Sequence, residues 1–195
     1  MPLLPLEPFV FPNDLLTQPL AEIETVPWWV LHTRPRTEKA LARRLLHGHI
    51  RFFLPVRKHQ WRNKGRLFCS HVPLFPGYLF LQAERDVVGK TLETNFVSRV
   101  LAVDDQRQLH LDLGRVYCLI TSGAPLGPEE RLRPGSPVEI TAGPLAGMEG
   151  KILRRGKQLK FFVEVQFLQR GVSVEIESWM IQPRSSPDPL MTANV

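Results

Sequence analysis

The chain has 195 residues, of which 43% are hydrophobic, and a formal net charge of +6 at pH 7. That apolar content supports one or two small packed domains, and no apolar run approaches the roughly 20 residues that a membrane-spanning helix needs. Cys69 and Cys118 are the only cysteines. Two are too few for a disulfide framework, which excludes the small disulfide-bonded secreted class and favours a reducing compartment, the cytoplasm.

Positive charge is concentrated in one segment. Residues 1–26 contain four acidic residues and no Lys or Arg, whereas between Trp28 and Val72 a single acid, Glu38, faces eleven Lys and Arg. Such a segment creates a positive field and favours a polyanionic partner such as nucleic acid. Composition alone leaves open a soluble basic surface with no specific partner.

The first 26 residues predict an extended, partly disordered leader. Prolines disfavour regular helix there, at positions 2, 5, 8, 12 and 19. No basic residue precedes the apolar patches, so a signal peptide is not indicated. The apolar run Phe9-Val10-Phe11 has the composition to dock on a surface.

Residues 28–103 predict strands and helices in α+β order. The run 28–32 predicts a buried strand, and 35–47 a helix with Pro35 in its first turn and Gly48 as its stop. Residues 56–62 and 66–72 predict a hairpin across the turn 63–65. A strand over 78–81, a helix over 86–93 and a strand over 97–103 follow. One sheet with helices against a face would bury this pattern.

Two groups of basic residues are candidate nucleic-acid contacts. On the predicted helix, Leu41 and Leu45 mark the core face, and basic side chains gather on the opposite side. Guanidinium groups pair well with phosphate, although a solvated helix face is the alternative. Trp61, in the hairpin, is able to stack on a base, but cross-strand packing is the simpler role. The candidates are Arg34, Arg36, Lys39, Arg43, Arg44 and His47, with Arg62, Lys64 and Arg66 at the hairpin turn.

The C-terminal part changes to short strands separated by glycine. Residues 121–130 have linker composition, and strands are predicted at 137–141, 150–155, 159–167 and 171–177, a spacing typical of a small barrel. We therefore expect domains at 27–118 and 131–183, a linker at 119–130 and a disordered tail at 184–195. The predicted barrel core alternates along these strands: Val138, Ile140, Ile152, Val163, Val165, Val174 and Ile176.

Two segments resemble the NusG family of transcription factors, in the family's order. Trp28-Trp29-Val30-Leu31, Phe53-Leu54-Pro55 and the run from Pro73 to Phe80 resemble its N-terminal NGN domain. The runs 135–140 and 143–152, with Gly143, Pro144, Gly147 and Gly150, are similar to the KOW motif. The spelling of 73–80 leans towards the specialised paralogues, of which RfaH is the best known. The resemblance covers residues 28–182 and implies an α+β fold: an NGN-type α/β sandwich, with an antiparallel sheet and flanking helices, plus a small SH3-like β-barrel.

The resemblance implies a non-enzymatic elongation and antitermination factor. It would bind the clamp helices of the largest RNA polymerase subunit, contact upstream or non-template DNA, and suppress pausing. Phe75 and Tyr78, on the stiffened backbone of Pro76 and Gly77, would line an exposed apolar depression. From the pattern alone, a core role for both rings is the alternative. The implied polymerase contacts are Trp29, His32, Phe53, Pro55, Leu74, Phe75, Pro76, Gly77, Tyr78 and Thr91.

The sequence departs from the family at two implied contacts. In the general factor the turn at Phe167-Leu168-Gln169-Arg170 meets Rho or a ribosomal protein; here Leu168-Gln169 replaces Phe-Gly. In the run 89–92, only Thr91 keeps the His-Thr-Thr-Thr chemistry of the RfaH-like branch. The alternative function is a KOW-type RNA- or ribosome-binding protein without polymerase contact.

The sequence does not indicate an active site. His47, His49, Cys69 and His71 lack the paired spacing of a structural zinc site. We find no phosphate-binding glycine loop or nucleophile elbow. We therefore expect no metal, no cofactor and no membrane contact, and a monomeric protein.

Overall fold

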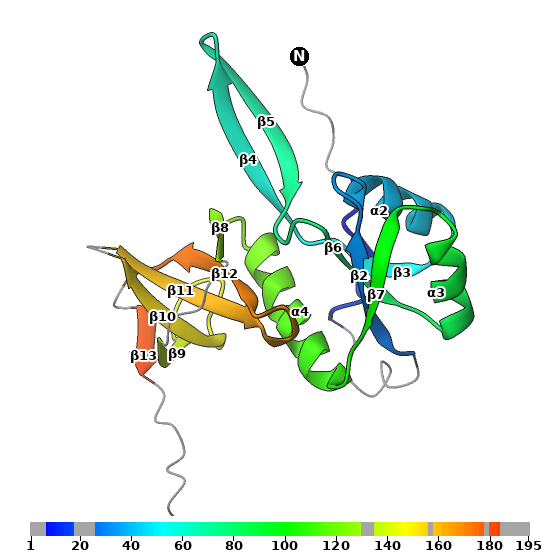
Figure 1. The fold of residues 1–195 in the computed structure, drawn as a ribbon. Coiled ribbons are helices and arrows are strands. Elements are labelled where there is room, and N and C mark those ends of the chain that lie inside the picture. Colours follow the sequence, from blue (N-terminus) through cyan, green and yellow to red (C-terminus); the bar gives the residue numbers. More distant parts are fainter. Residues whose placement is uncertain (1–6, 18–25, 130–134, 156–157, 178–179, 184–195) are drawn as a thin grey trace, which may run out of the picture.

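The computed structural model describes residues 7–17, 26–129, 135–155, 158–177 and 180–183. These residues form a five-stranded sheet, a two-stranded hairpin and a six-stranded sheet (Figure 1). The predicted tail at 184–195 lies outside the described residues.

The five-stranded sheet has the order β1-β3-β6-β2-β7, with every neighbouring pair antiparallel. The predicted strands at 28–32, 78–81 and 97–103 are confirmed within a residue or so. The mixed α and β class with antiparallel sheets is confirmed as well. The strands are β1 (Val10–Phe11), β2 (Trp28–Thr33), β3 (Arg51–Phe53), β6 (Tyr78–Gln82) and β7 (Val97–Ala102).

Alternation along the strands gives this sheet two buried faces. Leu31, Phe52 and Leu79 pack with helices α2 (Glu38–His47) and α3 (Arg85–Leu92). Their neighbours Val30, Phe53 and Phe80 point the other way. That second face packs against helix α4 (Gln106–Thr121), which lies between the two large sheets in Figure 1.

Helix α2 begins three residues later than predicted. The Arg34 backbone N–H donates to the Phe96 carbonyl oxygen at 2.8 Å, and Thr37 Oγ1 donates to the Arg34 carbonyl oxygen at 2.8 Å. These bonds close a turn in which Arg36 has a φ of 63°, outside the helical region. Pro35 therefore precedes the helix and does not occupy its first turn.

Helix α4 was not predicted, and it changes the expected linker. The Asp105 side chain caps it by accepting from the Gln108 N–H at 2.8 Å. Leu109, Leu113 and Val116 are fully buried at helical spacing. The helix ends at Thr121, and β8 (Leu126–Glu129) then pairs with a C-terminal strand. Residues 119–129 of the expected linker thus lie mostly in α4 and β8, with residues 122–125 joining the two, and residue 130 lies outside the described residues.

Part of the predicted disordered leader belongs to the core. Strand β1 pairs with β3, and Val10, Leu15 and Leu16 are buried. An edge strand tolerates the neighbouring prolines because it needs only one set of ladder hydrogen bonds. The docking suggested by the apolar run Phe9-Val10-Phe11 agrees with the structure, whereas the packing of residues 12–16 was not expected. Residues 1–6 and 18–25 lie outside the described residues.

The six-stranded sheet, which we call the C-terminal sheet, has the order β13-β9-β10-β11-β12-β8 and is antiparallel throughout. Four of its strands were predicted; β8 and β13 were not. Six of the seven predicted core residues are buried, and Ile152 is partly buried. The remaining strands are β9 (Ser136–Ile140), β10 (Glu149–Arg155), β11 (Gln158–Val165), β12 (Arg170–Glu175) and β13 (Ile181–Pro183).

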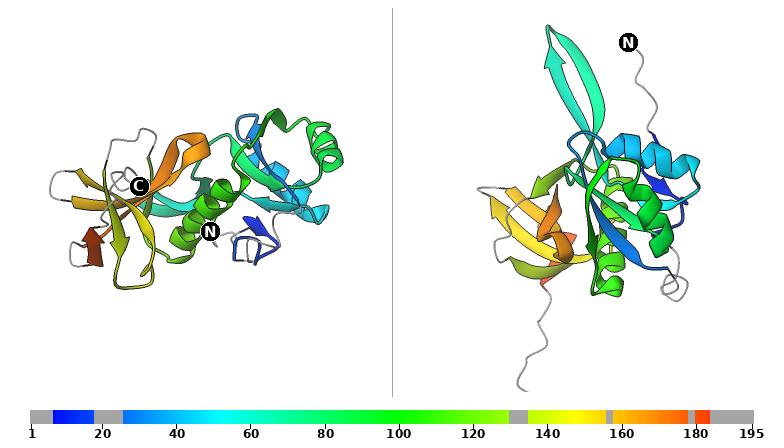
Figure 2. Two further views of the ribbon diagram at one scale, coloured as in Figure 1. Left: turned by 90° about the horizontal axis from the view of Figure 1, so that it is seen from below. Right: turned by 45° about the vertical axis from the view of Figure 1, so that its right-hand side comes forward.

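The predicted hairpin is confirmed. Strand β4 (Val56–Asn63) pairs with β5 (Arg66–Pro73) as a separate antiparallel ribbon. Lys64 and Gly65 connect the strands with φ values of 46° and 76°. Positive φ at both central residues is the geometry of a type I′ turn, which matches the twist of a hairpin. The hairpin projects away from the rest of the molecule (Figures 1 and 2). No helix of the described residues is long and apolar enough to cross a membrane.

Candidate binding surfaces

A buried glutamate fixes the loop between β5 and β6. The Gly77 N–H donates to Glu38 Oε1 at 2.9 Å, and the Thr33 N–H donates to the Gly77 carbonyl oxygen at 2.8 Å. Gly77 has a φ of 83°, so another residue at this position would strain the turn. Glu38, the one acid in the basic segment, thus holds the loop in place from inside the fold.

Tyr78 lies at the end of the sheet beside His32. The two residues are cross-strand partners, and their rings meet edge to face with centroids 5.2 Å apart. His32 Nδ1 lies 2.7 Å from Ser98 Oγ. Tyr78 is half-buried, whereas His32 and Pro76 are exposed. We call Tyr78, His32, Pro76 and Gly77 the Tyr78 surface.

Phe75 does not contribute to an exposed depression. Its side chain is 2% exposed and packs edge to face on Phe80, with ring centroids 6.3 Å apart. The Leu74 N–H donates to the Pro55 carbonyl oxygen at 2.8 Å, which holds this part of the loop against the sheet. Phe53, Pro55 and Leu74 are also buried. The expected exposure of Phe75 is therefore wrong in this conformation.

Two further predicted polymerase contacts lie apart from the Tyr78 surface. Trp29 packs on the opposite face of the sheet, with its Nε1–H donating to the Ala83 carbonyl oxygen at 2.9 Å. Thr91 is buried in α3, where its hydroxyl donates to the Val87 carbonyl oxygen at 2.8 Å. The ten predicted residues do not form one continuous surface.

The C-terminal sheet contacts the Tyr78 surface. The Arg170 guanidinium carbon lies 5.4 Å from the centroid of the Tyr78 ring, a cation–π geometry. Arg170 ends the predicted partner-binding turn, which overlaps the 3-10 turn η1 (Gln166–Leu168). Leu168 packs into the apolar core shared with α4, while Phe167 and Gln169 are exposed. One part of this turn therefore faces the N-terminal domain, and the other faces solvent.

A buried carboxylate of α4 accepts a hydrogen bond from η1. Asp112 is 1% exposed, and its Oδ2 accepts from the Gln166 backbone N–H at 2.9 Å. Gln108 Nε2 and Arg115 Nη1 approach its Oδ1 at 2.7 and 3.4 Å. Burial raises the pKa of the Asp112 carboxyl, against the lowering effect of these hydrogen bonds and of the Arg115 charge. The sequence signal for this contact was weak, because Asp112 and His110 are polar residues among the buried positions of an unpredicted helix.

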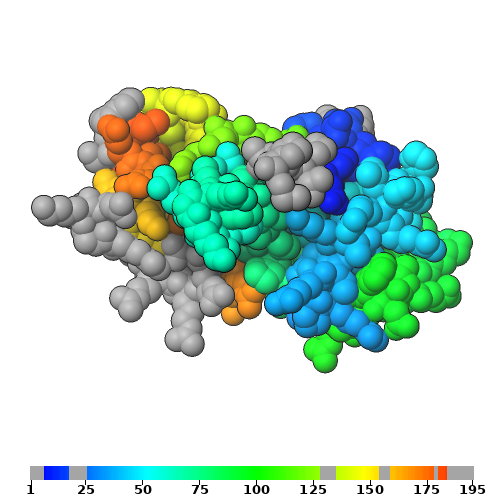
Figure 3. All heavy atoms as spheres, turned by 90° about the horizontal axis from the view of Figure 1, so that it is seen from above, coloured from blue at the N-terminus to red at the C-terminus, as the bar shows by residue number. Residues whose placement is uncertain are grey.

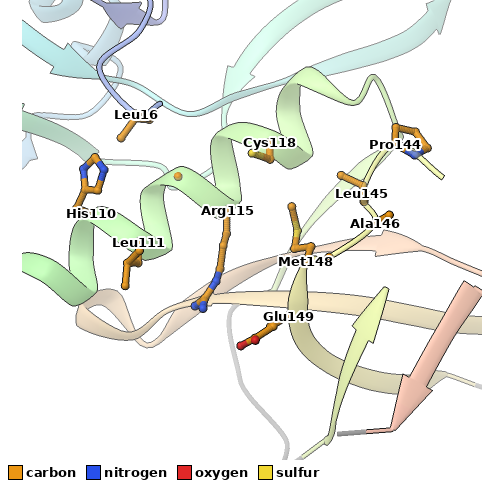
Figure 4. Close-up of a pocket in the computed structure, with 12 residues that line it drawn as sticks. Leu16, His110, Leu111, Arg115, Cys118, Pro144, Leu145, Ala146, Met148 and Glu149 are labelled. Atoms are coloured by element: carbon orange, nitrogen blue, oxygen red, sulfur yellow. The ribbon is translucent and has the colours of Figure 1, made fainter. Parts of the chain in front are cut away.

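The KOW-like loop faces α4 across an open groove. The groove has a volume of about 540 Å³. Figure 4 shows Leu145 and Met148 on one side of it, with Leu111 and Cys118 of α4 on the other. Burial lowers the pKa of His110 and raises that of the Cys118 thiol. The residues of the predicted KOW-like motif lie in two parts of the structure. Pro144 and Gly147 line the groove, and Gly150 lies in β10.

Gly150 has a packing reason to be glycine. A Cβ atom there would lie 2.6 Å from the Phe162 carbonyl oxygen and 2.5 Å from the Phe161 ring. The close approach of β10 to β11 thus requires the smallest residue. Gly143 and Gly147 have φ values of 84° and 82° in the preceding loop.

Three of the four predicted basic residues of α2 are exposed, and the fourth, Lys39, is half-buried. Arg43, Arg44 and His47 lie on the outer side of the helix. Arg43 Nε is 3.5 Å from Glu7 Oε2, and both side chains are about half exposed, so this pair contributes little to stability. Arg34 Nη2 donates to Asn95 Oδ1 at 3.2 Å, and Arg36 is exposed beside it.

The hairpin extends this positive surface. Burial lowers the pKa of His71 in β5, and the charges of Lys39 and Lys58 lower it further. Lys39 of α2 and Lys58 of β4 therefore lie near the same imidazole. No Asp or Glu occurs between residues 39 and 83. We call α2 and the hairpin together the basic surface; Figure 3 views it with the hairpin pointing at the reader.

Metal-binding chemistry is not assembled in the described residues. His47 and His49 stand at the end of α2, whereas Cys69 and His71 stand on β5. Within this part of the chain, no three His, Cys, Asp or Glu side chains gather as a metal site would require.

Comparisons with known proteins match the N-terminal domain. This domain combines an antiparallel sheet, helices and the connecting loop with a basic surface. Residues 27–111 match the family model described as "Transcription termination factor nusG". This range runs from β2 into α4 and covers less than half of the chain. Residues 27–111 are therefore similar to the NusG family over the range expected for an NGN-like domain.

One solved structure matches a larger share of the chain. It is described as "Crystal Structure of MjSpt4:Spt5 complex conformation B". The match has 17% sequence identity and covers 82% of this chain and 97% of that chain, with a TM-score of 0.25. That score is too low to support an argument about how the parts are arranged. A search of curated proteins gives no match.

Proposed function

We propose that the chain is a transcription elongation and antitermination factor of the RfaH-like kind that binds the clamp helices of the largest RNA polymerase subunit. The observation that carries this proposal is the NusG-family match over residues 27–111. The domain in that range presents a half-buried tyrosine beside an exposed histidine, on a loop held by Glu38. A rigid aromatic residue of this kind is a common anchor of protein interfaces.

Polymerase binding at the Tyr78 surface requires the C-terminal sheet to move away. Arg170 stands over the Tyr78 ring in the free chain, and the apolar core continues from Phe75 through α4 into the C-terminal sheet. Polymerase would then select the open population, at the free-energy cost of separating the two parts. The buried Phe75 acts in this proposal by supporting the loop.

The basic surface would hold the DNA of the transcription bubble. Its Lys and Arg side chains neutralise phosphates at the upstream fork or on the non-template strand. The C-terminal sheet, which we infer to be an SH3-like KOW barrel, would recruit Rho or a ribosomal protein through the exposed part of the turn at Phe167. In this mechanism binding free energy opposes opening of the clamp and no covalent bond changes.

Retention of the full chain on bacterial core RNA polymerase tests the proposal. Tyr78→Ala should weaken retention at least about tenfold, because truncation of an interface anchor costs 2 kcal/mol or more. The matched control is Tyr117→Ala, which removes the chain's other half-buried tyrosine from α4. That variant should bind as the wild type does.

Two outcomes would contradict the proposal. The first is equal retention of the folded Tyr78→Ala variant and the wild type. The second is retention of the chain by ribosomes or RNA in place of polymerase, which would favour the KOW-type alternative. The retention experiment uses the whole chain because the two sheets share an apolar core. A fragment ending at residue 118 would truncate α4 and remove the C-terminal sheet that packs against this helix.

A further inference from the structure

Three rings form a continuous ladder on one face of the projecting hairpin. The Trp61 indole stacks on the Phe68 ring, with centroids 5.6 Å apart and an interplanar angle of 17°. The His59 imidazole also stacks on the Trp61 indole, with centroids 5.6 Å apart and an angle of 20°. We call His59, Trp61 and Phe68 the ring ladder.

The strand register explains why the three rings share a face. Trp61 is the direct cross-strand partner of Phe68, and His59 lies two residues from Trp61 on β4. The same register places Arg57 and Arg66 on the ladder's face, at its base and at its tip. Arg62 and its partner Leu67 fall on the opposite face.

Trp61 and Phe68 remain substantially exposed to solvent despite this stacking. Trp61 is 42% exposed and Phe68 is 37% exposed, both high values for large apolar side chains. The hairpin is a separate two-stranded sheet that stands clear of both larger sheets (Figures 1 and 2). Cross-strand packing therefore explains the contacts between the rings, but it does not explain why so much aromatic surface is exposed.

We propose that the ring ladder is a stacking platform for unpaired bases of single-stranded DNA. Every base has a π-face, so stacking on aromatic side chains tolerates any sequence. Arg57 and Arg66 at the ends of the ladder would bind the flanking phosphates. This inference deepens and rests on the proposed function, because a transcription bubble supplies the unpaired strand.

Charge favours DNA over a protein partner. The hairpin strands and their turn carry Arg57, Lys58, Arg62, Lys64 and Arg66 and no acid. A purely basic rim around aromatic rings matches a polyanion with exposed bases, whereas a typical protein interface is depleted in lysine. Bases in a duplex have both faces covered, so the platform selects unpaired DNA.

Fluorescence anisotropy of a labelled oligothymidylate, titrated with the full chain, tests the platform. Trp61→Ala and Phe68→Ala should each weaken binding about fivefold or more, as alanine substitution of a base-stacking residue does. Leu67→Ala is the matched control: Leu67 is a neighbour of Phe68, 62% exposed, and on the opposite face of the hairpin. Its affinity should equal that of the wild type.

Salt dependence separates stacking from phosphate contact. Removal of a ring leaves the phosphate contacts in place, so Trp61→Ala should lower affinity equally at all salt concentrations. Arg66→Ala should instead reduce the slope of log affinity against log salt by about 0.7, the value for one phosphate contact on a single strand. A reduced slope for Trp61→Ala would overturn the assignment, because the ring would then act through the neighbouring charges.

Two measurements guard against loss of the hairpin in the alanine variants. Trp61→Phe should restore most of the affinity lost in Trp61→Ala, since phenylalanine also offers a π-face. In the wild type, an oligothymidylate carrying 5-iododeoxyuridine should crosslink to Trp61 or Phe68 on irradiation. Crosslinks that map only outside residues 56–73 would overturn the proposal.

The outcomes also separate this inference from the proposed function. Trp61→Ala should still bind core polymerase, because the ring ladder is not part of the Tyr78 surface. Normal polymerase binding together with unchanged DNA affinity of both ring variants would reject the platform and leave the proposed function intact. Tighter binding of an oligouridylate than of the oligothymidylate would overturn the DNA assignment in favour of RNA.

Discussion

Gln169 occupies a position suited to glycine. Its φ of 51° lies in the left-handed region, which costs a residue with a Cβ roughly 1–2 kcal/mol. The side chain is exposed, so it has little packing to lose. Gln169→Gly should relieve this strain, but glycine also loses more conformational entropy on folding. The net result should be a free energy of unfolding higher by up to about 1 kcal/mol. Urea denaturation followed by tryptophan fluorescence measures this change.

Gln60→Gly is the matched control for the glycine effect. Gln60 is exposed in the middle of β4, where the backbone is extended and glycine gives no relief. Stability should fall there by about 0.5–1 kcal/mol. A loss of stability in Gln169→Gly would show that the glutamine side chain has a stabilising contact in solution.

Asp112 gives the contact between α4 and the C-terminal sheet a pH dependence. Burial raises its pKa in the folded chain, and the nearby Glu164 charge adds to this, so folding favours the protonated carboxyl. Stability from this group is therefore greatest below its unfolded pKa of about 3.9 and declines as the pH rises through the raised value. Asp112→Asn should remove that decline, measured as the difference between the two proteins' urea midpoints from about pH 4 to pH 7.

The hydrogen bond to Gln166 is separable from the charge of Asp112. Asparagine retains an oxygen that accepts from the Gln166 N–H, whereas alanine leaves that donor unpaired. Asp112→Ala should therefore be less stable than Asp112→Asn by about 1–3 kcal/mol at every pH, because neither side chain titrates. Identical pH dependence of the wild type and Asp112→Asn would assign the raised pKa to another carboxyl.

At the scale of elements, local patterns predicted what local forces determine. The hairpin follows from its turn residues, and β2, β6 and β11 follow from runs of apolar and β-branched residues. The basic surface was predictable because spacing alone places charges on one side of a helix. The charge of a segment and the spacing of its apolar residues depend only on residues that are close in the sequence.

Elements that depend on distant packing were missed. Helix α4 carries Asp112 and Arg115 among its apolar residues, and its core face became clear only once the C-terminal sheet was packed against it. Strand β1 is two residues long and exists because β3 offers it an edge. The burial of Phe75 has the same origin, since its ring packs on Phe80, a residue that the sheet brings beside it.

At the scale of the whole molecule, the two sheets share one apolar core across α4. That core joins Trp28, Leu113 and Val163, which come from three different parts of the chain. Separation of the sheets would expose apolar area and the Asp112 contact, so the closed form is stable in the free chain. Access to the Tyr78 surface is then a balance between this docking energy and polymerase affinity.

Arg170 tests that balance because it reaches the Tyr78 ring from a half-buried position at the start of β12. Arg170→Ala removes a cation–π interaction worth about 0.5–1 kcal/mol, and should raise polymerase affinity about two- to fivefold by increasing the open population. Arg85→Ala, an exposed arginine at the start of α3, should leave the affinity unchanged. In a Tyr78→Ala background the gain should vanish, since the guanidinium then has no ring to cover; a gain that persists there would mean that Arg170 opposes polymerase directly, by its charge.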